Sequence, residues 1–366
     1  MHPFHRDFYN MVRDTILRNS VSFLLGPLKC GKSVCLRQIH DEIGNSEYVD
    51  LKKDASGDLY KQLEVFDRIF QAIKSNEDRL FLLDEITYVI NVEFQIKEMA
   101  RIFDDYSNNK TKIVITGSQS VALNAWANRA FGIGAGYIDA GFLAYTEFLR
   151  YKGLKEISAQ TFNAFLYDSV AFHNITSLKE YLTRCIEETY ISNDHTTEYI
   201  FDNDIFLIED KIDLLVNICC QTLFPLLNEG NAQIFIDDNN YKNSILRSLG
   251  TSVKGIEKIG RALLVGYFSI QNTNIKTMKQ ALIFLKMCGL ITISPITEDI
   301  ERVPNLYQDL YSDYSKINYS KELFHSYTVN VTHPMFYVLI LKGLLKKNMP
   351  EELPGPVVKR IMEYNA

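Results

Sequence analysis

The first 150 residues predict an α/β fold, a parallel sheet covered by helices on both faces, and the remaining residues predict a mostly helical half. Short, continuously apolar runs alternate with segments of helical period, which is typical of parallel strands buried on both faces. A glycine-rich octapeptide stands between the first such strand and the next helix. After Leu149 the alternation stops, and residues 160–190 and 208–290 have helical patterns.

The expected elements follow one another in a regular order. Apolar residues at helical spacing predict helices at 4–18, 32–43, 59–73, 92–105 and from about 119. Apolar or strand-like runs between them predict strands at 21–25, 48–51, 80–83 and 112–116. In the second half we expect an amphipathic helix at 275–288, a strand at 290–296 and an apolar helix from Met335 to Leu345.

Composition indicates a globular chain of two or three domains. Hydrophobic residues make up 46% of the 366 residues and charged residues 23%, too apolar for a disordered chain. The net charge of −6 disfavours a wholly electrostatic nucleic-acid binder. The six cysteines form no CxxC pair, which disfavours a disulfide framework and a structural zinc site. With no secretory leader and no run long enough to cross a membrane, we expect a cytoplasmic protein that does not engage a membrane.

The octapeptide Gly26-Pro27-Leu28-Lys29-Cys30-Gly31-Lys32-Ser33 matches G-x-x-x-x-G-K-[ST]. Glycines let the backbone wrap around a phosphate, and the following helix offers its positive end. We expect Lys32 to reach the β- and γ-phosphates and the Ser33 hydroxyl to bind Mg²⁺. The predicted nucleotide-binding residues are Gly26, Pro27, Leu28, Lys29, Cys30, Gly31, Lys32, Ser33 and Val34.

Two further strands end in polar residues. The strand at 80–83 is followed by Asp84, placed to bind Mg²⁺ with Ser33, and by Glu85, placed to activate the attacking water. The strand at 112–116 leads into Ser118, a candidate sensor of the γ-phosphate or the water. Because parallel strands end at one edge of a sheet, these side chains are expected to face a common crevice. The hydroxyls at 116–120 could also simply cap the next helix.

These motifs, with Tyr145-Thr146-Glu147-Phe148-Leu149, resemble the AAA+ superfamily, and within it a group of prokaryotic ATP-binding proteins. The resemblance covers residues 1–150. It departs at Leu28, Lys29, Cys30, Thr87, Phe142 and Ala144, and none of these departures removes a phosphate- or metal-contacting group. It implies ATP as the nucleotide. It also implies an arginine finger, for which Arg129 is the only arginine between the sensor helix and residue 145.

The resemblance also implies a winged-helix domain, which residues 244–296 fit loosely. Its best helix carries Lys276, Lys279 and Lys286, which in a DNA groove would contact phosphates. The surrounding acids and the net charge favour packing against protein instead. The expected organisation is an AAA+-like P-loop ATPase domain (1–150), a helical connector (151–240) and a winged-helix-like carboxyl-terminal domain (241–366).

The favoured function is a Mg²⁺-dependent ATPase whose hydrolysis drives a conformational switch on a partner. Expected partners are ATP and ADP, a second copy of the chain, and protein or DNA bound through the carboxyl-terminal domain. A nucleotide-gated DNA-binding regulator is the alternative. A small-molecule kinase is a third reading, disfavoured because the sequence offers no recognisable lid or acceptor pocket.

Overall fold

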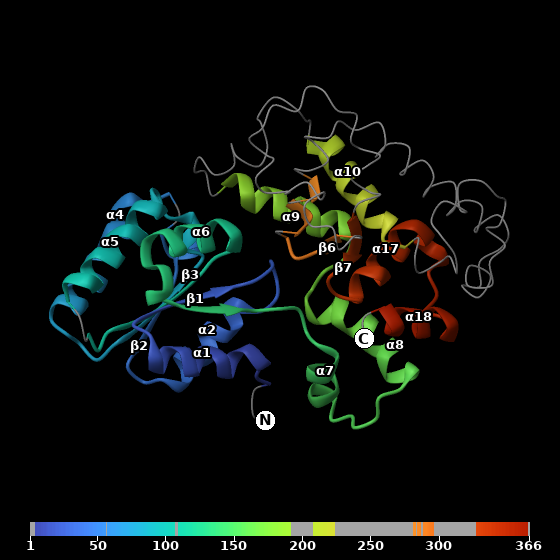
Figure 1. The fold of residues 1–366 in the computed structure, drawn as a ribbon, viewed down its shortest axis with the longest axis horizontal. Coiled ribbons are helices and arrows are strands. Elements are labelled where there is room, and N and C mark those ends of the chain that lie inside the picture. Colours follow the sequence, from blue (N-terminus) through green and yellow to red (C-terminus); the bar gives the residue numbers. More distant parts are fainter. Residues whose placement is uncertain are drawn as a thin grey trace. The chain divides into compact units, whose positions relative to one another are not determined.

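A computed structural model describes residues 4–55, 57–106, 109–191, 208–223, 281–282, 284–286, 288–295 and 327–364. The chain divides into two compact units (Figure 1). The first unit comprises Met1–Glu147 and Cys185–Tyr199, and the second comprises Phe148–Arg184 and Ile200–Ala366. Within the described ranges, none of the helices combines the length and the apolarity needed to span a bilayer.

A five-stranded parallel sheet forms the centre of the first unit. Its strands are β1 (Val21–Leu25), β2 (Ser46–Asp50), β3 (Leu80–Asp84), β4 (Lys112–Thr116) and β5 (Gly136–Asp139). Their order is β2-β3-β4-β1-β5. The register pairs Asp50 with Asp84 and Leu24 with Thr116. The carboxyl ends of all five strands therefore lie along one edge, where ligands bind in open parallel sheets.

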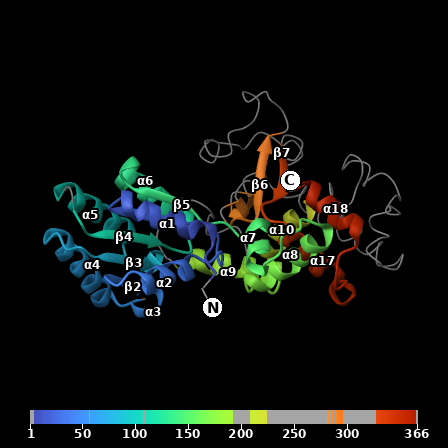
Figure 2. The same cartoon turned by 90° about the horizontal axis from the view of Figure 1, so that it is seen from below.

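Helices cover both faces of this sheet, as Figures 1 and 2 show. One layer contains α4 (Leu59–Lys74), α5 (Val92–Asp105) and α6 (Ser120–Phe131), and the other contains α1 (Asp7–Arg18) and α2 (Lys32–Glu42). Strand residues such as Phe23, Phe81 and Ile115 are buried against the first layer. Short helical turns complete the unit: α3 (Leu51–Asp54), η1 (Ile86–Tyr88) and η2 (Gly132–Gly134).

The predicted α/β class is confirmed. The strands at 21–25 and 112–116 and the helix at 92–105 have the predicted bounds. The predicted strand at 48–51 runs instead from Ser46 to Asp50, because Asp50 caps α3 by accepting a hydrogen bond from the Lys53 backbone. The sequence did not predict β5, whose sequence Gly-Tyr-Ile-Asp has too little apolar character to be recognised alone.

The second unit is rich in helices. They are the main part of α7 (Tyr145–Lys152), α8 (Ala159–Phe172), the first half of α9 (Leu178–Ile191), α10 (Ile208–Gln221), α17 (Met335–Leu345), η5 (Lys346–Asn348) and α18 (Gly355–Tyr364). Helix α17 has the predicted bounds and is buried along most of its length. Asn163 on α8 exchanges two side-chain hydrogen bonds, both of 3.2 Å, with the backbone of Leu353 before α18.

The described part of residues 241–366 includes one antiparallel pair, β6 (Ile291–Pro295) with β7 (Tyr327–Val331). The strand predicted at 290–296 is confirmed, whereas its partner was not predicted. Lys276 and Lys279, most of the proposed winged helix and the boundary at residue 240 lie outside the described residues. Residues 185–199, expected in the helical connector, are grouped with the first unit.

Candidate active site

The loop between β1 and α2 has a backbone that only certain residues adopt easily. Gly26 has φ +145° and Gly31 φ +106°, and Lys29 is also left-handed at φ 62°. A Cβ on Gly26 would lie 2.1 Å from the carbonyl oxygen of Ala140, so a side chain cannot fit there. Gly31 supplies no side-chain cap to α2, which leaves the first N–H groups of the helix for an anion.

Lys32 is the first residue of α2 and is 7% exposed. Its ammonium donates to the carbonyl oxygens of Gly26 (2.8 Å) and Pro27 (2.9 Å), both at the start of the same loop. An ammonium has three donors, so these contacts fix Lys32 beside the loop as a positive charge.

The side chains of the other predicted loop residues differ in exposure. Cys30 is fully buried, and Val34 exposes 57% of its surface on α2. Ser33 is partly exposed in the first turn of α2. The Val34 side chain is directed mostly to solvent, and the role of Ser33 as a Mg²⁺ ligand stays a prediction.

Asp84 ends β3 and is 1% exposed. Its Oδ2 accepts a hydrogen bond of 2.6 Å from the Tyr48 hydroxyl, which itself accepts one of 3.2 Å from Arg37 Nε. The Oδ1 atom is buried and has no hydrogen-bond partner among the described residues. A buried, unpartnered carboxylate oxygen is costly unless a cation binds it. Asp84 therefore fits a Mg²⁺ ligand of the kind that acts together with a hydroxyl and substrate phosphates.

Glu85 follows Asp84 with a left-handed backbone, φ 55°. Its Oε2 accepts a hydrogen bond of 2.9 Å from the backbone N–H of Ser118. Burial raises the pKa of Glu85, and the Asp84 carboxylate adds to the rise, while Lys32 and the Ser118 hydrogen bond oppose it. A carboxylate with a raised pKa is a better proton acceptor, as a general base requires.

The segment after β4 connects to two parts of the edge. Ser118 contacts Glu85 through its backbone, and Ser120 contacts Gly26 in the loop between β1 and α2. The Ser120 Oγ accepts from the Gly26 N–H at 2.8 Å and lies 2.6 Å from the Gly26 carbonyl oxygen, to which it donates. The sheet order explains this, because β4 lies directly between β1 and β3.

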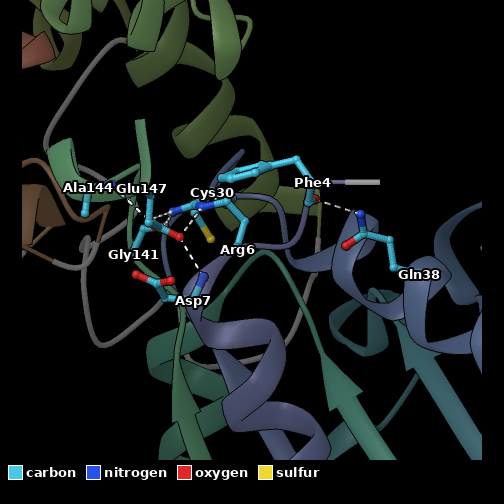
Figure 3. A network of polar contacts seen from close by, with 8 residues as sticks. All are labelled: Phe4, Arg6, Asp7, Cys30, Gln38, Gly141, Ala144 and Glu147. Carbon is cyan, nitrogen blue, oxygen red and sulfur yellow. Dashed lines mark hydrogen bonds and ion pairs between the residues drawn. The ribbon is translucent and has the colours of Figure 1, made fainter. Parts of the chain in front are cut away.

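Behind the loop, Arg6 and Glu147 form a buried ion pair (Figure 3). Arg6 Nε and Nη2 donate to the two carboxylate oxygens at 3.0 and 3.1 Å. The Asp7 and Ala144 N–H groups donate to the same carboxylate. Burial alone would raise the pKa of Glu147, but Arg6 and the two N–H groups hold it below the usual value.

Arg6 also contacts the backbone of the loop between β1 and α2. Its Nη1 donates to the Cys30 carbonyl oxygen at 2.8 Å (Figure 3). In a trans peptide the carbonyl and the next N–H point in opposite directions. The contact therefore directs the Gly31 N–H away from Arg6, and fixes the orientation of one amide in the loop that the motif assigns to phosphate binding.

Arg129 does not join this group of residues within the chain. It lies nine residues into α6, about 14 Å along the axis from the start of the helix. Its Nη1 pairs with Glu93 of α5 at 3.0 Å, and its side chain is 57% exposed. A role at a phosphate would therefore require a second copy of the chain.

The structure thus brings Lys32, Asp84, Glu85 and Ser118 to the edge where the sequence predicted them. Sequence reasoning missed Arg6, Tyr48, Ser120 and Glu188, which contact these residues or the loop. Ser120 lies within a motif that had been recognised. The other three are far from their partners in sequence, and no local pattern marks them.

Residues 18–149 match the family described as an AAA domain. No curated protein matches the chain. Among solved structures, the chain resembles the Walker-type ATPase PABY2304 of Pyrococcus abyssi at 14% identity, covering 93% of this chain and 96% of that one, with a TM-score of 0.40. It also resembles Cdc6p from Pyrobaculum aerophilum at 11% identity, covering 96% of each chain, with a TM-score of 0.34. At such scores these likenesses carry no conclusion about this chain.

Proposed function

We propose that the chain binds ATP with Mg²⁺ and hydrolyses it, a proposal supported by the match of residues 18–149 to the AAA domain family. The observation that carries the proposal is the pair of acids at the end of β3. Asp84 has a buried oxygen free to bind a cation, and Glu85 has a raised pKa. One acid suits a metal and the other suits a proton, which are the two needs of this reaction.

In this proposal, separate residues bind the phosphates, the metal and the attacking water. Loop amides and the N-terminus of α2 bind the phosphates, and Lys32 adds a positive charge at the β- and γ-phosphates. Ser33 and Asp84 would hold Mg²⁺, which would supply positive charge against the triphosphate. Glu85 accepts a proton from the attacking water, and the Ser118 N–H orients its carboxylate. Tyr48 keeps Asp84 in place through the hydrogen bond to Oδ2.

Steady-state phosphate release with ATP and Mg²⁺ tests this function in wild type, Lys32→Ala and Glu85→Gln. We expect turnover in wild type and its loss in both variants, with Glu85→Gln still binding ATP. Glu64→Gln is the matched control, because Glu64 is exposed on α4. Absence of turnover together with equal ATP affinity in wild type and Lys32→Ala would overturn the proposal.

We further propose that hydrolysis drives a conformational switch acting on a partner protein or DNA, and that a second copy supplies Arg129. The exposure of Arg129 supports the second point. Turnover per chain should then rise with protein concentration in wild type, and this rise should be absent in Arg129→Ala. A concentration-independent rate in wild type would remove the role of Arg129.

A further inference from the structure

Glu188 lies beside Ser118, at the edge formed by the carboxyl ends of the strands. It is 39 residues beyond the matched family region, which ends at residue 149. It belongs to the part of α9 that is grouped with the first unit. Its side chain is 18% exposed. No residue around it in the sequence marks it as part of a site, and only the folded chain places it there.

Glu188 forms two hydrogen bonds with the segment that follows β4. The Ser118 hydroxyl donates to its Oε2 at 3.1 Å, and the Gln119 side-chain amide donates to its backbone carbonyl at 2.8 Å. Two contacts to consecutive residues fix both the position of α9 at this point and the direction of the Glu188 carboxylate.

Two other groups hold the same carboxylate. Lys52 Nζ donates to Oε1 at 2.6 Å, and the Tyr88 hydroxyl donates to Oε2. Lys52 also lies 4.6 Å from the centre of the Tyr88 ring. The Glu188 carboxylate thus accepts hydrogen bonds from three side chains, of which Ser118 is the one expected at the reacting phosphate.

A serine hydroxyl has one proton to donate. When Ser118 donates to Glu188, that proton is not available to a γ-phosphate oxygen or to the attacking water. The Glu188 carboxylate, which accepts from the Ser118 hydroxyl at 3.1 Å and pairs with Lys52, also places an acid beside the position expected for the γ-phosphate. A γ-phosphate, which is strongly negative, therefore meets both a competitor for Ser118 and a like charge.

We propose that Glu188 sets the preference of the site between nucleoside triphosphate and diphosphate, by competing with the γ-phosphate for the Ser118 hydroxyl. A diphosphate has no γ-phosphate and does not encounter this competition. Glu188 is a specificity-determining residue that acts through Ser118. The inference rests on the proposed function, since it assumes that ATP binds at this edge.

The test compares the affinities of a non-hydrolysable ATP analogue and of ADP, both with Mg²⁺, by calorimetry. In Glu188→Gln the analogue should bind about 10-fold more tightly, because a charge near the γ-phosphate is removed. ADP affinity should change less than about 2-fold. Glu187→Gln is the matched control, since Glu187 is the exposed neighbour on the same helix, and neither affinity should change.

Two more variants separate this role from a merely structural one. Tyr88→Phe removes one donor to Glu188 Oε2, the oxygen that also accepts from Ser118, so the carboxylate should compete more strongly and shift the ratio of affinities in the opposite direction by a smaller factor. In a Ser118→Ala background the effect of Glu188→Gln should shrink, because the shared hydroxyl is gone. Equal changes for both nucleotides, or an unchanged ratio, would overturn the proposal.

Lys32→Ala separates the two levels of failure. If the analogue binds wild type and Lys32→Ala equally, the proposed function itself fails. If binding depends on Lys32 while Glu188→Gln leaves the ratio of affinities unchanged, only the role of Glu188 fails.

Discussion

Glu85 and Glu147 are two acids of one domain with opposite electrostatics. Both acids are largely removed from solvent, but the pKa of Glu147 is lowered whereas that of Glu85 is raised. Burial raises the pKa in both cases. The partners decide the outcome, because Glu147 has Arg6 and two N–H donors, whereas Glu85 has one N–H donor and acids nearby.

The difference separates an acid suited to a structural role from an acid suited to the proposed role of proton acceptor. A carboxylate whose oxygens are fully occupied by donors stabilises the fold and is unsuited to accepting a further proton. A carboxylate crowded by other acids weakens the fold, but is a stronger base. Asp84 stands between them, with one oxygen held by Tyr48 and one without a partner among the described residues.

The largest expected effect is on ATP turnover, and it follows from changing Glu85. Glu85→Gln should lower ATP turnover by about 10²–10⁴-fold, because it removes the proton acceptor. Glu147→Gln should change turnover per folded molecule far less. Phosphate release measured well below the melting temperature of each variant checks this. An equal loss in both variants would show that the two acids do not differ in role.

Disrupting the ion pair of Glu147 should lower the stability of the fold. Arg6→Ala leaves Glu147 buried without its ion-pair partner, so the free energy of unfolding should fall by about 3–5 kcal/mol. Urea denaturation measures this. Arg13→Ala is the matched control, since the Arg13 side chain is 54% exposed, and should change stability by less than about 1 kcal/mol. A loss in Arg6→Ala no larger than in the control would refute the buried pair as a stabilising element.

The role of Asp84 can be tested through Tyr48, whose hydroxyl donates to Oδ2. Tyr48→Phe removes the hydrogen bond to Asp84 Oδ2, and the affinity for Mg²⁺ should fall by about 10–100-fold. Titration of Mg²⁺ at constant ATP, followed by nucleotide binding rather than turnover, measures it. Tyr60→Phe is the control, because Tyr60 is 82% exposed on α4. Unchanged Mg²⁺ dependence in Tyr48→Phe would mean that Tyr48 does not position the metal ligand.

The smallest expected effect is on the pH dependence of stability, where the two acids should act in opposite directions. The lowered pKa of Glu147 gives stability that is present above its ordinary value of 4.5 and is lost as pH falls through the pKa of the folded protein. The raised pKa of Glu85 gives stability that is present below the ordinary value and is lost as pH rises through the pKa of the folded protein. At neutral pH, Glu147→Gln should therefore destabilise and Glu85→Gln stabilise, each by on the order of 1 kcal/mol.

Thermal melting between acidic and neutral pH follows both variants. The two differences from wild type should have opposite signs at neutral pH and shrink as pH falls, because a protonated acid and an amide are similar. Differences of the same sign at neutral pH would contradict the comparison.

Local sequence was enough where a residue acts through its own segment. The glycines of the loop and Lys32 were recognised because loop and helix N-terminus are contiguous in the chain. Asp84 and Glu85 follow directly from an apolar strand end. Strand β5 was missed because its four residues become a strand only by pairing with β1.

The sequence by itself determined the fold class of the first 150 residues, the phosphate-binding loop and the two acids at the end of β3, because each depends on residues close together in the chain. Tertiary structure decided which acid has a lowered pKa, since Glu147 meets Arg6 across 141 positions. It also brought Glu188 to Ser118 across 70 positions. Electrostatic character depends on distances in space, and the order of the chain does not contain those distances until the sheet has formed.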